Sequence, residues 1–181
     1  LGIFPLFDLD EGAFSEATRE MLLSGNFLTT YLEGKLRFDK PILIYWLQAI
    51  SASLFGINEW GFRLPSAIAT ITWAQALYQF CKQHFDRSRA LTCVILFACS
   101  LHINIIGKAA ISDALLNLCI TISMLSLCSY IIDNRQKYLT RFYIATGLGL
   151  LTKGPIALLI PGVTTLLYCI IKQERILLQA L

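Results

Sequence analysis

The sequence has 181 residues, of which 56% are hydrophobic and 15% are charged, and its mean hydropathy is +0.62. Soluble domains carry about 25% charged residues, so this composition excludes an ordinary water-soluble protein and indicates an integral membrane protein. The net charge of +3 is small and no basic run is present, which excludes the usual signature of a nucleic-acid-binding protein.

The first seven residues are apolar but too few to cross a bilayer, which requires about 20 residues. No basic region precedes them, as it would in a signal peptide. We therefore interpret residues 1–7 as the end of a spanning helix. Because both ends of the sequence are abrupt, we expect it to be a fragment of a longer protein.

The most polar stretch of the chain, residues 8–41, contains seven carboxylates and four basic residues. Within it, Gly12–Ser24 predicts an amphipathic helix, with apolar side chains on one side and charged side chains on the other. Asp10 is a candidate cap for this helix, and Gly25 is a candidate stop. Such a helix lies along the membrane interface, and we expect a loop over Asn26–Arg37 to follow it.

The segment Pro41–Asn58 has no charged residue but carries several polar side chains, so it either spans the membrane or lies in the interface. If it lies in the interface, one side of the membrane receives eight basic and three acidic residues. The positive-inside rule then places that side in the cytoplasm and residues 8–41 outside. If the segment spans, residues 8–40 join the basic side and lie in the cytoplasm. Charge counting leaves both arrangements open.

Four later runs are approximately long enough to cross a membrane and contain no Lys, Arg, Asp or Glu. They are Leu64–Cys81, Ala90–Gly107, Ala114–Ile132 and Gly154–Ile171. Phe142–Thr152 is too short to cross alone and Pro155 follows it closely, so we expect two helices to meet at a turn beside Lys153. The six cysteines lie in or beside apolar runs without a metal-binding spacing, which is typical of packing residues.

Charged residues beside the apolar runs are the candidates for chemistry, because the sequence has no phosphate-binding glycine loop, nucleophile elbow or zinc motif. Asp10 and Glu11 either supply favourable charge at a helix N-terminus or act as a general base or electrostatic partner. Asp113 begins a spanning run and is either a helix cap or a site residue.

Four basic residues would share one side of the membrane if Pro41–Asn58 lies in the interface. These are Lys40, Arg63, Lys108 and Lys153. Basic residues at helix ends often only extend their charge to the interface. A group of four on the side that the charge rule disfavours would also suit a lipid-linked phosphate, which accepts several charge-assisted hydrogen bonds.

Several segments occur together in a characteristic order. They are Asp10–Met21, Ser24–Phe27, Phe38–Pro41, Tyr45–Leu47, Leu54–Gly56, Arg63–Ser66, Ser112–Leu116 and Leu151–Pro155. The first six resemble the first extracytoplasmic loop of the polyprenyl-phosphate-sugar glycosyltransferases, and the last two resemble later landmarks of the same enzymes. These are the GT-C type membrane enzymes of glycosyltransferase family 39, which include bacterial 4-amino-4-deoxy-L-arabinose transferases of lipid A and protein O-mannosyltransferases.

The resemblance implies an all-α, polytopic transmembrane fold in which Gly12–Ser24 and Pro41–Gly56 are interfacial helices. The implied boundaries are 1–7 for the end of the first spanning helix, 8–60 for the extracytoplasmic loop and 61–181 for further spanning helices. The implied activity moves a sugar from a polyprenyl-phosphate donor to a lipid, glycan or protein acceptor at the outer face of the cytoplasmic membrane.

The resemblance also implies site residues. Asp10 matches the catalytic carboxylate, with Glu11 beside it. Substrate binding is expected to involve Asp39, Lys40, Arg63 and Asp113. Among these, Lys40 matches a group that contacts the donor phosphate. Asp39 stands where the family usually has Glu, a position that contacts a metal ion in some members, so a divalent metal ion is a candidate cofactor whose ligands stay unassigned.

Two positions depart from the family pattern. The aminoarabinose transferases have Arg-Tyr where this chain has Ala13-Phe14, so one phosphate-binding cation is absent at that place. Asp39 is one methylene shorter than the usual Glu. A transporter or a lipid-phosphate-binding protein without chemistry is the competing class, because its cavity would also place charged groups at a membrane face.

Overall fold

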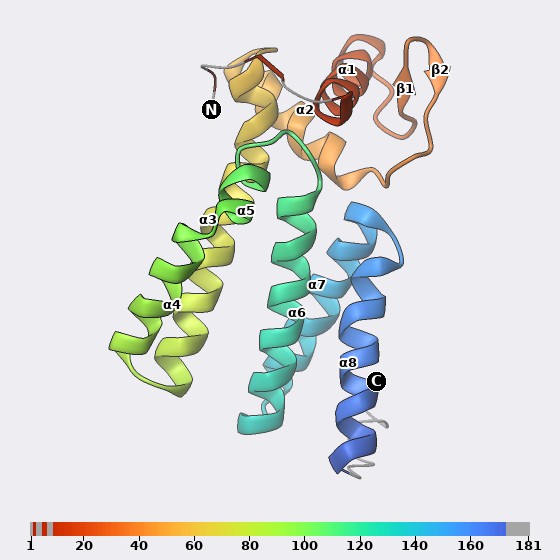
Figure 1. Cartoon of the computed structure of the whole chain (residues 1–181). Helices are drawn as coiled ribbons and strands as arrows, with labels where there is room; N and C mark the ends of the chain where they lie inside the picture. Colours follow the sequence, from red (N-terminus) through yellow and green to blue (C-terminus); the bar gives the residue numbers. More distant parts are fainter. Residues whose placement is uncertain (1, 3–4, 7–8, 173–181) are drawn as a thin grey trace.

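A computed structural model of the chain describes residues 2, 5–6 and 9–172, and its main architecture is helical (Figure 1). The segment predicted to end an earlier spanning helix, residues 1–7, lies largely outside the described residues. The helices are α1 (Leu9–Ser24), α2 (Leu43–Phe55), α3 (Glu59–His84), α4 (Arg87–Cys99), α5 (Leu101–Ile106), α6 (Asp113–Asp133), α7 (Gln136–Lys153) and α8 (Ile156–Lys172). A short hairpin pairs β1 (Tyr31–Leu32) with β2 (Lys35–Leu36).

The helices form two parts (Figure 1). Helices α3, α4, α6, α7 and α8 run side by side, with α6 packed against α3, α7 and α8. Helices α1 and α2 and the hairpin gather at one end of this bundle. The expected helical architecture, with the helices of Gly12–Ser24 and Pro41–Gly56 set apart at one end of the bundle, is therefore confirmed.

Helix α6 carries the strongest membrane signal among the described residues. It is 21 residues long with a mean hydropathy of 2.0, and it is the one described helix that is both long and apolar enough to cross a bilayer. The predicted run Ala90–Gly107 is instead divided, because Ser100 adopts an extended conformation (φ −70°, ψ 119°) between α4 and α5.

Helix α2 settles the ambiguity over Pro41–Asn58. Its 13 residues extend about 20 Å, which is less than the roughly 30 Å of a hydrocarbon core. It contacts both α1 and α3 at the end of the bundle, and it does not run beside the long helices (Figure 1). The described part of the polar stretch, residues 9–41, lies at the end opposite the basic ends of α3, α4 and α7, as the interfacial arrangement predicts.

Helix α1 buries the face that its sequence predicts. Phe14, Ala17 and Met21 are at most 2% exposed and pack against α2. The helix begins at Leu9, so Asp10 lies in its first turn and does not cap it as predicted. The stop at Gly25 is confirmed by its φ of 69°, a conformation that glycine adopts without steric cost.

Two connections differ from the expected ones. The predicted loop Asn26–Arg37 contains the β1–β2 hairpin, because Glu33 and Gly34 both adopt positive φ and make a two-residue turn. Helix α7 starts at Gln136, earlier than the apolar run Phe142–Thr152 indicates, since charged residues in its first two turns interrupt the run. Its turn into α8 is where the sequence predicts it.

Candidate functional site

The predicted site residues all lie on the end of the bundle that carries α1 and α2, but they form separate groups. Asp10 is exposed in the first turn of α1, where a carboxylate interacts favourably with the helix dipole. Glu11, the next residue, is 3% exposed and points into the protein. Adjacent residues on a helix differ by about 100° in direction, so these two carboxylates meet different environments.

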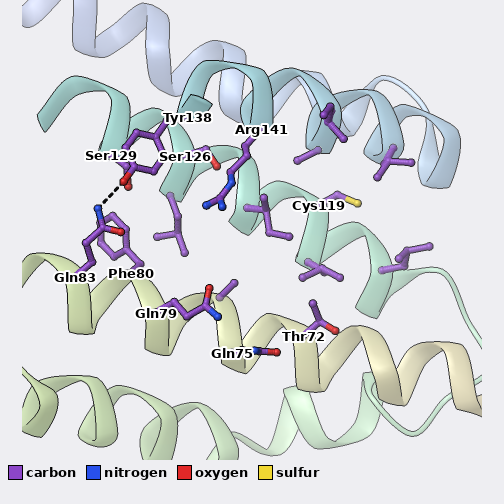
Figure 2. A pocket seen from close by; sticks show the side chains of 18 of the residues that line it. Thr72, Gln75, Gln79, Phe80, Gln83, Cys119, Ser126, Ser129, Tyr138 and Arg141 are labelled. Carbon is purple, nitrogen blue, oxygen red and sulfur yellow. Dashed lines mark hydrogen bonds between the residues drawn. The ribbon is translucent and has the colours of Figure 1, made fainter. Parts of the chain in front are cut away.

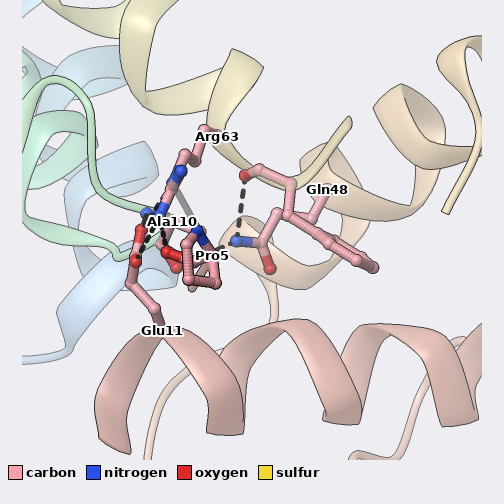
Figure 3. A network of polar contacts seen from close by, with 6 residues as sticks. Pro5, Glu11, Gln48, Arg63 and Ala110 are labelled. Carbon is pink, nitrogen blue, oxygen red and sulfur yellow. Dashed lines mark hydrogen bonds and ion pairs between the residues drawn. The ribbon is translucent and has the colours of Figure 1, made fainter. Parts of the chain in front are cut away.

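Glu11 forms a buried ion pair with Arg63 of α3 (Figure 3). Arg63 Nε donates to Glu11 Oε1 at 3.0 Å, and Arg63 Nη2 donates to Glu11 Oε2 at 2.9 Å. The same Nη2 also donates to the Pro5 carbonyl at 2.9 Å, while the Ala110 backbone N–H donates to Glu11 Oε1 at 2.6 Å. This bidentate pair therefore ties α1 to α3 and to the segment before α6.

Gln48 completes this buried network from α2 (Figure 3). Its side chain is fully buried, and its Nε2 donates to the carbonyls of Phe62 at 3.3 Å and Ala110 at 3.1 Å. Its Oε1 accepts a hydrogen bond from the Thr18 hydroxyl at 2.9 Å. Both backbone polar groups of Ala110 are thus held by side chains, which fixes the chain three residues before Asp113.

Asp113 pairs with Lys153 across 40 residues of sequence. Asp113 lies in the first turn of α6 and Lys153 in the last turn of α7, so each charge also has the sign that its own helix dipole favours. Both side chains are about one third exposed. The sequence identifies Lys153 as a landmark without a role, and only the antiparallel packing of α6 and α7 reveals its partner.

Asp39 and Lys40 lie before α2 and belong to a third group, which includes Arg37. Asp39 Oδ1 contacts Lys40 Nζ and Asp39 Oδ2 contacts Arg37 Nη2, both at 3.2 Å. The Lys40 ammonium, with help from Arg37, holds the pKa of Asp39 below its usual range, so the carboxylate is ionised at neutral pH. One exposed carboxylate thus orients two cations and leaves the group with a net positive charge.

Arg37 and Tyr45 are the neighbours of this group that residue-by-residue sequence reasoning misses. The guanidinium of Arg37 lies over the Phe14 ring, 5.8 Å from its centre, and Phe14 packs against Tyr45 with 5.5 Å between ring centres. Phe14 is one turn after Asp10 on α1, so Arg37 contacts the same helix that carries the candidate catalytic carboxylate. The signal available in the sequence is the short spacing of Arg37, Asp39 and Lys40.

A cavity of about 600 Å³ lies between α3, α6 and α7 (Figure 2). It reaches Leu43 and Leu47 of α2, and most of its wall is apolar. Arg141 of α7 extends into the space towards α3 (Figure 2). At the end of the bundle opposite α1 and α2, Gln83 donates hydrogen bonds to the Tyr138 hydroxyl at 2.6 Å and to Asp133 at 3.0 Å.

A metal site does not emerge from the part of the chain that the structure describes. No group of three His, Cys, Asp or Glu side chains comes together there. At the position where a metal contact was considered, both oxygens of Asp39 already face cations. These residues by themselves therefore do not fit a divalent metal ion.

The sequence family described as dolichyl-phosphate-mannose-protein mannosyltransferase matches residues 39–181. The chain belongs to this family. The resemblance stated from the sequence motifs is thereby confirmed.

Curated relatives extend the match through the polar stretch at the start of the chain. The undecaprenyl phosphate-alpha-4-amino-4-deoxy-L-arabinose arabinosyl transferase of Wigglesworthia glossinidia brevipalpis is 32% identical over 94% of the chain and 31% of its own length. The Aeromonas hydrophila protein of the same description is 34% identical over 96% of the chain and 32% of its length. The chain thus spans about a third of the length of these relatives.

Solved structures share the fold. The crystal structure of ArnT from Cupriavidus metallidurans in the apo state superposes with a TM-score of 0.93 at 21% identity, over 99% of this chain and 34% of that one. The structure of ArnT from the same organism bound to undecaprenyl phosphate gives a TM-score of 0.92 at 21% identity, over 98% of this chain and 34% of that one. The fold is therefore that of a membrane GT-C protein, and the chain is a membrane protein.

Proposed function

We propose that the full-length protein is a membrane glycosyltransferase that moves a sugar from a polyprenyl-phosphate donor to a lipid, glycan or protein acceptor. The observation that carries this proposal is that the exposed carboxylate Asp10 and the group in which Arg37 and Lys40 contact Asp39 both lie at the end of the bundle that carries α1 and α2. Named relatives of the chain use undecaprenyl-phosphate-linked aminoarabinose, which supports a polyprenyl-phosphate donor.

The reaction requires the protein to stabilise the departing phosphate and to activate or orient the acceptor. Negative charge develops on the departing phosphate, and Lys40 stabilises it in this proposal; the partial exposure of its ammonium beside Asp39 supports that role. Asp10 takes the proton from an acceptor hydroxyl, or orients an acceptor phosphate that needs no base. The configuration at the sugar is expected to be inverted.

The other predicted residues form two ion pairs at the same end of the bundle. Glu11 and Arg63 satisfy each other in a buried pair, so we assign them to holding α1 in place, and their predicted direct roles in catalysis and substrate binding stay predictions. Asp113 and Lys153 form a partly exposed pair at the same end of the bundle, and Asp113 stays a predicted substrate-binding residue.

The donor sugar and the membrane face are also part of the proposal. A pentosyl donor of the aminoarabinose class and a lipid acceptor of the lipopolysaccharide type are the first pair to test, since the relatives carry that description. The aminoarabinose transferases have Arg where this chain has Ala13, so hexosyl donors should be tested as well. The positive-inside rule supports an extracytoplasmic site, because among the described residues the opposite end of the bundle has more basic than acidic side chains, whereas the α1–α2 end has more acidic than basic ones.

The test is sugar transfer by the purified full-length protein carrying Asp10→Asn. We expect transfer from a polyprenyl-phosphate sugar to fall about 100- to 10,000-fold, because the base is lost, while binding of the donor is retained. Asp86→Asn is the matched control: Asp86 caps α4 at the opposite end of the bundle, and asparagine caps a helix equally well.

Two results would contradict the proposal. Wild-type transfer by the Asp10→Asn protein would exclude Asp10 as the catalytic carboxylate. Movement of the intact sugar-lipid across the membrane, without cleavage of the sugar–phosphate bond, would instead support the competing transporter class.

A further inference from the structure

Arg37 is held rigidly at the polar end although no secondary structure contains it. Its side chain is only 14% exposed, its Nη2 contacts Asp39, and its guanidinium stacks over the Phe14 ring. Its backbone is fixed as well, because the Arg37 N–H donates to the Thr30 carbonyl at 2.9 Å and the Thr30 hydroxyl donates to the Arg37 carbonyl. An arginine fixed in this way is pre-organised for a ligand.

Two buried donors of this group have no hydrogen-bond acceptor. They are the Nε of Arg37 and the hydroxyl of Tyr45, whose side chain is fully buried. Burial raises the pKa of the Tyr45 phenol, although the nearby Arg37 charge opposes this, so the hydroxyl keeps its proton at neutral pH. Buried donors without acceptors are rare in folded proteins, and each one calls for an explanation.

The charges around these donors favour an anion. Arg37 and Lys40 each contact one oxygen of Asp39, so two cations flank a single carboxylate. Asp39 is 51% exposed and its charge is compensated, whereas the surplus positive charge has no counterpart among these three residues. A tetrahedral oxyanion offers several acceptor oxygens and could accept hydrogen bonds from Arg37, Tyr45 and Lys40 at once.

We propose that Arg37 and Tyr45 form an oxyanion subsite that binds a phosphate group beside Lys40. The proposal rests on the proposed function in one respect, namely that the phosphate belongs to a polyprenyl-phosphate substrate. The subsite itself follows from the two unsatisfied donors and the paired cations. Arg37 and Tyr45 are then binding residues in addition to those that the sequence predicts.

Binding of sugar-free polyprenyl phosphate to the full-length protein in nanodiscs tests the subsite without any transfer step. We expect Arg37→Gln to weaken this binding about 10- to 100-fold, because a charge-assisted hydrogen bond is lost. Tyr45→Phe should weaken it about 3- to 10-fold, because a neutral donor is lost. Arg19→Gln, which removes an exposed arginine paired with Glu16, is the matched control and should leave the affinity unchanged.

A second measurement separates ligand binding from a purely structural role. Removing a hydroxyl whose proton has no acceptor in the folded protein should leave the melting temperature of Tyr45→Phe unchanged or higher. Lowered stability together with unchanged affinity would overturn the proposal. Unchanged affinity in both the Arg37→Gln and Tyr45→Phe proteins would overturn it as well.

Inorganic phosphate provides the arm that identifies the source of the anion. If Arg37→Gln weakens the binding of polyprenyl phosphate alone, the subsite is specific for a lipid-borne phosphate. If it weakens the binding of both ligands equally, the subsite binds phosphate from either source. The Asp10→Asn protein should keep the Arg37-dependent affinity. Arg37-dependent binding in a wild-type protein that transfers no sugar would therefore refute the proposed function and leave the subsite standing.

Discussion

Two neighbouring carboxylates at the start of α1 show how strongly environment decides the role of a residue. Asp10 is exposed and available to a substrate, whereas Glu11 is buried between Arg63 and the Ala110 backbone N–H. A buried ion pair is costly to break, because the remaining charge then lacks compensation in a medium of low polarity. Glu11 is therefore better suited to fixing α1 than to exchanging protons with a substrate.

The Glu11–Arg63 pair makes a prediction about stability. We expect Glu11→Gln to destabilise the folded protein by about 3–5 kcal/mol, because Arg63 loses the carboxylate that compensates its buried charge. Heat denaturation of the purified protein in detergent measures this change. Glu16→Gln on the same helix removes an exposed partner of Arg19 and should have almost no effect. Equal effects of the two substitutions would contradict a structural role for the buried pair.

At the scale of elements, close helix packing at the α6–α7–α8 junction sets the geometry of the Asp113–Lys153 pair. A Cβ atom at Gly149 of α7 would lie 2.7 Å from the Ala157 Cβ and 3.3 Å from the Cys119 Cβ. Both distances are shorter than an ordinary contact, so the absence of a side chain at Gly149 allows α7 to approach its neighbours. Lys153 follows one turn later and takes its position from this approach.

This packing predicts opposite effects for two glycines of one helix. Gly149→Ala should destabilise the protein by about 1–2 kcal/mol, because overpacking outweighs the better helix propensity of alanine. Gly147→Ala, at a position with open space around the added methyl group, should instead stabilise it by up to about 1 kcal/mol. Melting temperatures of the two variants provide the measurement. A stabilising Gly149→Ala would show that the helices can move apart without cost.

At the scale of the whole molecule, charge separates the two ends of the bundle. Lys82, Arg87, Arg89, Arg135 and Lys137 lie on or beside the helix ends opposite α1 and α2. The carboxylates of the polar stretch are at the α1–α2 end. Such an asymmetry orients a membrane protein with its basic end in the cytoplasm.

The orientation predicts which residues a membrane-impermeant thiol reagent reaches. In a cysteine-free full-length protein in intact cells, Lys35→Cys in the exposed hairpin should be labelled from outside. Arg87→Cys at the start of α4 should be labelled only after the membrane is opened. The reverse pattern would place the candidate site in the cytoplasm and contradict the proposed outer face.

The sequence by itself determined the membrane class, most of the helices and the polar end, because hydropathy and charge act over short stretches of chain. It also determined the family, through motifs whose order survives in the linear sequence. It predicted the buried face of α1 correctly from the spacing of Phe14, Ala17 and Met21. Hydropathy and charge left Pro41–Asn58 open, because an uncharged segment with polar side chains fits a spanning and an interfacial helix equally well, and only the family resemblance indicated the interfacial one.

Only the tertiary structure decided the partners of the charged residues. Glu11 meets Arg63 across 52 residues and Lys153 meets Asp113 across 40 residues, contacts that depend on how distant helices pack. The same packing buries the Tyr45 hydroxyl and brings Arg37 over Phe14. The physical reason is that residue type sets whether a charge needs a partner, while the direction of each side chain and the approach of separate elements decide which partner it finds.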